Sequence, residues 1–120
     1  MKVTLETKAI EDIDSIRDAF PKTPFITLSE SKGSTFGLSG EEVAAFIFVT
    51  LGGGVLTNAV YDLAKTYFIE SINRLRLSLA KRSVPIKITV NGISFKLETE
   101  EDVDPILEAI IDGLEEQKRT

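Results

Sequence analysis

The chain has 120 residues, of which 42% are hydrophobic and 28% charged, close to globular averages, so we expect one folded domain over residues 1–120. It contains no cysteine and no histidine, which excludes disulfides, cysteine-ligated zinc and Ser-His-Asp catalysis within the chain. Its net charge of -5 argues against nucleic acid as a partner, because attraction to phosphates requires positive charge.

The first 28 residues predict a strand, a helix and a second short strand. Val3 and Leu5 alternate with polar residues, which is typical of a strand with one buried face. Isoleucines and Phe20 then recur at helical spacing from residue 10, and Pro21 ends that helix. The apolar residues at 25–28 predict the second strand. Because the amino-terminal residues lack the continuous apolar core of a secretory signal, we expect a cytoplasmic protein.

The middle of the chain predicts a flexible loop and then a long helix. Residues 29–40 are rich in loop-forming side chains. Ser39 and Glu42 have the spacing of a capping box, so we expect a helix over residues 41–82. Unbroken, it would be about 60 Å long, too long for a compact domain whose radius of gyration is about 14 Å. We therefore expect this helix to break or kink at Gly52-Gly53-Gly54.

Residues 43–61, within this predicted helix, carry no charge, so we expect other protein surface to bury them. We expect a homo-oligomer that self-associates through the helix over residues 43–72. Two alternatives stay open: a membrane-associated accessory protein that uses the 43–61 segment, and a small anion- or nucleotide-binding domain that uses the glycine break. The predicted interface comprises Phe46, Phe48, Gly52, Gly53, Gly54, Leu56, Val60 and Tyr67.

The carboxyl-terminal third predicts a hairpin over residues 85–98 and a helix. Alternating apolar residues flank Asn91-Gly92, a pair that favours a two-residue type I′ turn. That register pairs Val90 with Ile93 and places the apolar side chains of both strands on one face. An apolar stripe from Val103 to Leu114 then predicts a helix, with a turn starting at Thr99. The fold class is α+β, with the hairpin and the amino-terminal strand in a small antiparallel sheet packed on helices.

Charge is unevenly distributed along the sequence. Residues 65–96 hold seven basic residues against Glu70, and residues 98–116 hold nine acids and no base. These blocks complement helix ends or neutralise each other across the fold, and the alternative is that the basic segment binds an anionic partner. No motif places catalytic, cofactor or metal residues together, so we expect a non-enzymatic protein with no cofactor and no metal.

The order of these elements resembles a known family. The features that carry the resemblance are Phe36-Gly37, the glycine triplet with Val55-Leu56, Arg74-Leu75-Arg76 and the hairpin from Val84 to Leu97. With this pattern the chain resembles the effector-associated constant component family of bacterial conflict and defence systems. The resemblance implies a non-enzymatic adaptor or assembly module with a protein effector as partner, and it carries over no catalytic residues.

Overall fold

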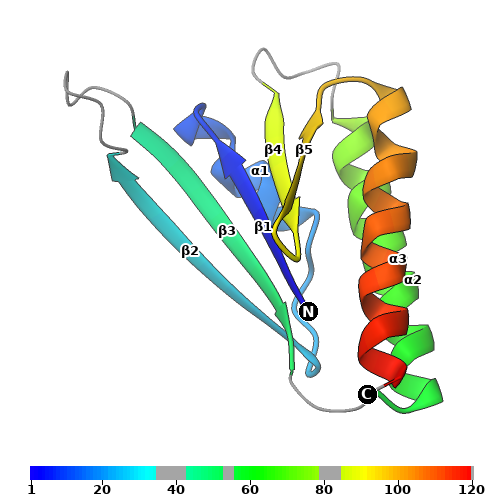
Figure 1. Cartoon of the computed structure of the whole chain (residues 1–120). Helices are drawn as coiled ribbons and strands as arrows, with labels where there is room; N and C mark the ends of the chain where they lie inside the picture. The colour runs from blue at the N-terminus through cyan, green and yellow to red at the C-terminus, as the bar shows by residue number, and fades with distance from the viewer. Residues whose placement is uncertain (35–42, 53–55, 79–84, 120) are drawn as a thin grey trace.

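The chain alternates strands and helices over the residues that the computed structural model describes, which are 1–34, 43–52, 56–78 and 85–119. In order they form β1 (Lys2–Thr7), α1 (Ile13–Asp18), β2 (Ile26–Ser34), β3 (Val43–Leu51), α2 (Asn58–Leu77), β4 (Ile86–Val90), β5 (Ile93–Leu97) and α3 (Val103–Arg119) (Figure 1). Short 3₁₀ turns lead into α1 and α3. The predicted α+β class is confirmed.

The five strands form one antiparallel sheet in the order β2-β3-β1-β4-β5. The units β1-α1-β2 and β3-α2-β4 therefore interlock, because each unit places its two strands on either side of one strand of the other. This arrangement is the split βαβ topology, and here β5 and α3 extend it at one end. In Figure 1, α2 and α3 lie side by side at the β4-β5 end of the sheet.

A single core lies between the sheet and the three helices. The inward side chains of the central strands, including Leu5, Ile47 and Ile88, are at most 1% exposed. They belong to the same cluster as Phe68 of α2 and Ile106 of α3. Strand residues alternate between buried and exposed positions, because the described helices cover one face of the sheet.

The predicted hairpin is confirmed in strand limits, register and turn. Val90 pairs with Ile93 and Ile86 with Leu97, and β1 joins β4 on the other side. Asn91 and Gly92 have φ values of 49° and 87°, as a type I′ turn requires. The predicted turn at Thr99 is also present, and the Asp102 carboxylate accepts hydrogen bonds from the backbone N–H groups of Thr99 and Glu98, both at 2.9 Å.

The expected long helix over residues 41–82 is wrong in its first half. Residues 43–51 form β3, which pairs with β1 on one side and β2 on the other. A continuous apolar run suits a strand with neighbours on both sides as well as it suits a helix, and the exposed Gly52 follows its end. Among the described residues of this range, the helix is Asn58–Leu77, and it begins where the Thr57 hydroxyl accepts from the Val60 N–H.

The expected loop over residues 29–40 is also shortened, because β2 continues to Ser34. Extended pairing with β3 satisfies the backbone of these polar residues, which outweighs their preference for turns. The capping box at Ser39 and Glu42 and the glycines at 53 and 54 lie outside the described residues.

Candidate functional site: the open face of the sheet

The face of the sheet opposite the helices is left without a helix by the described elements. We call it the open face. The register and the alternation of burial place the following residues on it: Thr27, Ser29 and Ser31 from β2, Phe46, Phe48 and Thr50 from β3, Lys2, Thr4 and Glu6 from β1, Lys87 and Thr89 from β4, and Ser94 and Lys96 from β5. Small hydroxyl side chains predominate among these residues.

Two aromatic rings lie near the middle of the open face. Phe46 and Phe48 are two residues apart on β3 and therefore point the same way. Their ring centroids are 6.1 Å apart and the ring planes differ by 7°, so the rings are parallel. The ammonium group of Lys2 lies 5.0 Å from the Phe48 centroid, within the range of a cation–π contact. Both rings are half-buried, which leaves part of each accessible to a ligand.

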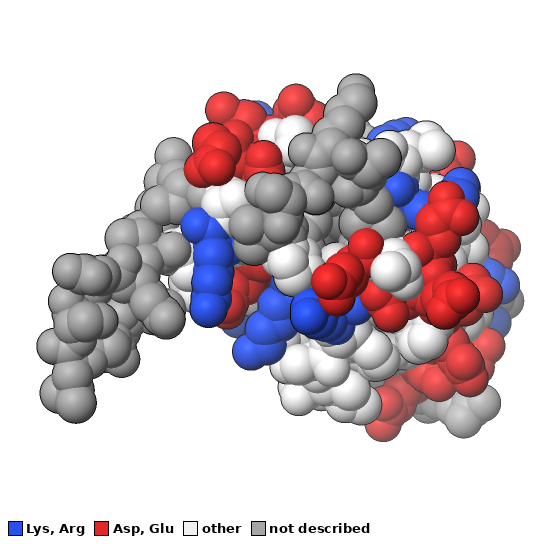
Figure 2. Space-filling model, turned by 90° about the horizontal axis from the view of Figure 1, so that it is seen from above, with Lys and Arg blue, Asp and Glu red and all other residues white. Residues whose placement is uncertain are grey.

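Lysines occupy the other half of the open face. Lys87 and Lys96 pair directly across β4 and β5, and Lys87 also pairs with Glu6 on β1. Lys96 forms an ion pair with Glu98 at 3.1 Å. A hollow of about 660 Å³ lies over these strands and is lined by these two lysines, Lys8, Glu6 and Ser94, among others. In Figure 2, acidic side chains gather on the helical side of the molecule and basic side chains form a group toward the middle of the view.

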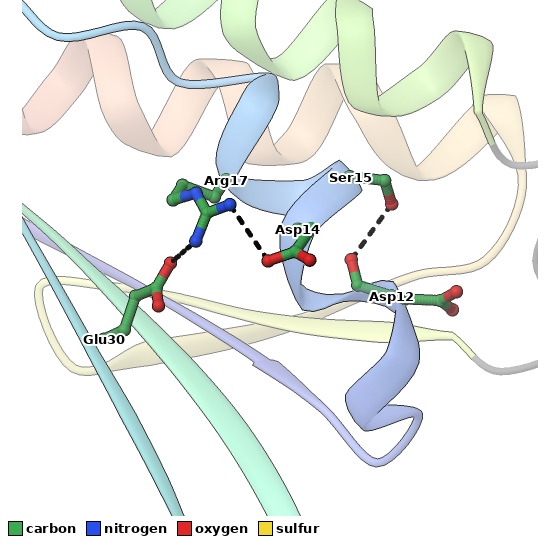
Figure 3. Close-up of polar contacts among 5 residues, drawn as sticks. All are labelled: Asp12, Asp14, Ser15, Arg17 and Glu30. Carbon is green, nitrogen blue, oxygen red and sulfur yellow. Dashed lines mark hydrogen bonds and ion pairs between the residues drawn. The ribbon is translucent and has the colours of Figure 1, made fainter.

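A second hollow, of about 620 Å³, lies between α1 and β2 on the helical side of the sheet. Its apolar lining includes Phe20 and Ile47. Arg17 lies in its wall and contacts Glu30 at 2.6 Å and Asp14 at 2.9 Å (Figure 3). The hydrogen bond and the charge of Glu30 raise the pKa of Arg17. The Arg17 guanidinium is already paired with the carboxylates of Asp14 and Glu30. An anionic ligand would therefore meet less unpaired positive charge in this hollow than on the open face.

The residues predicted as one interface are not brought together by the fold. Phe46 and Phe48 lie on the open face, whereas Leu56 and Tyr67 are 7% exposed in the core on the opposite side of the sheet. Val60 is half-buried on α2, and Gly52 is exposed at the end of β3. Gly53 and Gly54 lie outside the described residues.

The remaining charge blocks are partly neutralised within the fold. Arg74 and Arg76 lie in the last turn of α2, where cations interact favourably with the helix dipole. Arg76 also approaches Glu100 at 3.6 Å. Among the described residues, no three acidic side chains lie close enough together to hold a metal ion. None of the described helices combines the length and the hydropathy that crossing a membrane requires.

The fold and this surface define a small split βαβ domain whose sheet has one open face. No family model, no curated protein and no solved structure matches the chain.

The sequence did not identify Lys2, Lys87 and Lys96 as residues of the same sheet face as the two phenylalanines. The strand alternation of Lys87 and Lys96 was visible, but their sharing a face with Phe46 and Phe48 depends on the placement of β3 beside β1. The signal that would have revealed it is the enrichment of β3 in aromatic and β-branched residues together with its nine-residue length, both typical of strands.

Proposed function

We propose that this chain is a non-enzymatic interaction module that binds an anionic partner on the open face. One observation carries the proposal: the parallel Phe46 and Phe48 rings share a helix-free sheet face with three lysines and one glutamate. The face therefore has a net charge of +2 on a chain whose net charge is -5. An apolar centre with charged surroundings is the usual composition of a binding surface. We place this module in the cytoplasm, as the sequence led us to expect.

The test uses heparin, a polyanion without bases, added to the full ¹⁵N-labelled chain at low ionic strength. Amide chemical shifts are expected to change on β1, β3 and β4, at the residues of the open face. Lys87→Gln is expected to weaken binding. Lys118→Gln serves as the matched control, because Lys118 lies over the Tyr61 ring on the helical side. Shift changes confined to the helices, or no binding at low salt, would refute the proposal.

Self-association is a second candidate function, and the sheet edges favour it rather than the predicted helix over residues 43–72. In the described structure β2 and β5 pair on one side only. Strand β2 has nine residues and offers a second copy a long row of backbone hydrogen-bonding groups. Sedimentation velocity over a range of concentrations tests this candidate, and a monomer at every concentration would eliminate it. An effector protein, which the family resemblance implied, remains a candidate partner for either surface.

A further inference from the structure

The parallel rings of Phe46 and Phe48, with lysines on the same face, indicate which class of anion the open face accepts. Resting on the proposed function above, we infer that the partner is a single-stranded nucleic acid. Its bases stack on the exposed parts of the two rings, and its phosphates contact Lys2, Lys87 and Lys96. Aromatic side chains on an open sheet are a common platform for unpaired bases, because every base has a π-face.

The ring geometry favours a single strand over a duplex. The two centroids are 6.1 Å apart, whereas successive bases within one strand of a duplex are separated by about 3.4 Å. A strand that places consecutive bases on the two rings must therefore be extended. The rings are also on the flat surface of a sheet, flanked across the strands by Ser29 and Thr4, which are too small to block a base that approaches Phe48. The Lys2 ammonium lies 5.0 Å from the Phe48 centroid, so in the proposed complex it moves from the ring to a phosphate.

The charges of the open face favour nucleic acid over a second copy of the chain. Each open face has a net charge of +2, so two open faces brought together repel each other overall. An acidic peptide satisfies the lysines but not the rings, because the faces of aromatic rings are electron-rich and disfavour carboxylates. A nucleic acid satisfies both, since its phosphates are anionic and its bases are flat and aromatic.

The hydroxyl groups of the face provide polar contacts between the rings and the lysines. Thr4 lies between Phe48 on β3 and Thr89 on β4. The Thr89 and Ser94 hydroxyls are 3.1 Å apart and hydrogen-bond to each other. Hydroxyl side chains donate to and accept from base edges and the sugar, so this row connects the stacking platform to the hollow beside Lys87 and Lys96.

The experiment measures fluorescence anisotropy of labelled single-stranded DNA and RNA about 12 nucleotides long, within the usual site size of single-strand binders. The full chain is titrated into each, and the matching duplex is a third arm. We expect single-stranded DNA and single-stranded RNA both to bind more tightly than the duplex. The single strand that binds more tightly, DNA or RNA, identifies which nucleic acid is the natural partner. Equal or tighter duplex binding would overturn the inference.

The stacking contacts are tested with Phe48→Leu, which keeps an apolar side chain on β3 and removes the ring. We expect the dissociation constant to rise about 5- to 150-fold, the range that loss of one stacked base produces. Phe48→Ala tests the same contact at a larger cost in stability, and circular dichroism establishes that each variant is folded. Phe25→Ala is the matched control, because Phe25 is also half-buried but packs edge-on against Tyr67. It should leave the dissociation constant unchanged.

The phosphate contacts are tested by salt dependence. Lys87→Gln is expected to reduce the slope of log affinity against log salt by about 0.7, the value for one phosphate contact in a single strand.

Two results would overturn the nucleic-acid inference without refuting the proposed anion-binding function. If heparin binds the open face but Phe48→Leu does not weaken oligonucleotide binding, the face binds anions without reading bases. If polyglutamate binds more tightly than either oligonucleotide, the partner is an acidic protein. Either result overturns the inference and leaves the proposed function standing.

Discussion

Replacing Tyr67 by phenylalanine should stabilise the protein, and the gain should grow at high pH. The Tyr67 ring is packed in the core, 5.4 Å from the Phe68 ring in an edge-on arrangement. Its hydroxyl and that of Ser71 are buried without a hydrogen-bond partner among the described residues. A buried hydroxyl without a partner costs about 1–3 kcal/mol. Tyr67→Phe keeps the ring and removes the hydroxyl, so we expect the free energy of unfolding to rise by about 1 kcal/mol near neutral pH.

The pH dependence follows from the titration of the same hydroxyl. Burial raises the pKa of Tyr67 from 10.0 to about 12, although the charge of Arg74 and the nearby Ser71 hydroxyl, which does not meet the geometry of a hydrogen bond, partly oppose the shift. Below its ordinary pKa the group is protonated in both the folded and unfolded states, so it makes no pH-dependent contribution. Above it, the unfolded chain loses the proton while the folded chain keeps it, and stability falls as pH rises towards the folded pKa. By about pH 11 this loss reaches about 1.4 kcal/mol.

Urea unfolding followed by circular dichroism measures both effects. The difference between Tyr67→Phe and the natural chain should increase from about 1 kcal/mol near pH 8 to about 2.4 kcal/mol near pH 11. Tyr61→Phe is the control near pH 8, because the Tyr61 hydroxyl already donates to Glu115 Oε1 at 3.3 Å and its removal should not stabilise. A less stable Tyr67→Phe variant, or a difference that stays constant above pH 10, would show that the Tyr67 hydroxyl has a partner and refute the reasoning.

Four further predictions concern three glycines and one helix cap. Gly92→Ala should lower the free energy of unfolding by about 1–2 kcal/mol in a urea titration, because Gly92 has φ of +87°. Gly52→Ala, whose Cβ would meet nothing within 4 Å, should have almost no effect. Gly113→Ala should leave the melting temperature unchanged or slightly higher, because alanine has the better helix propensity and its Cβ would meet only the movable ends of the Asn91 and Met1 side chains, at 2.6 and 2.9 Å. A clear fall in the melting temperature would show that these two side chains cannot move aside. Two backbone N–H groups lower the pKa of Asp102 from 3.8, so its stabilisation is present above that pH and lost as pH falls below it. Asp102→Asn should therefore flatten the acid limb of a stability–pH curve, and an unchanged limb would exclude that role.

The hairpin was predictable because its information is local. Asn91-Gly92 fixes the turn, and the alternation of apolar and polar residues on both sides requires the register that the turn produces. Helix α3 was predictable for the same reason, since the apolar residues of its stripe, including Val103, Ile106 and Leu114, are buried or nearly so. In each case the local preference and the packing of the whole fold agree.

Strand β3 was not predictable from its periodicity. Its inward residues, such as Ile47 and Val49, are apolar because they lie in the core. Its outward residues Phe46 and Phe48 are apolar too, so the alternation that identifies a half-buried strand is absent. Had these two positions been polar, the strand would have been recognised. The residues that form the centre of the candidate site therefore also concealed the element that carries them, which is where local rules are expected to fail.

The net charge of the chain is a weak guide to its partners for a related reason, because a sum over the sequence contains no information on position. The basic segment over residues 65–96 is divided by the fold, with Arg74 and Arg76 on α2 and Lys87 and Lys96 on the sheet. Lys2, from the opposite end of the sequence, joins the latter two on the same face because alternation within β1 directs it there. The acids of α3 belong to the opposite layer. Screening at physiological salt acts over about 8 Å, so a ligand on the open face responds mainly to the nearby lysines rather than to the total of -5. An acidic protein with one basic face is therefore physically compatible with an anionic partner.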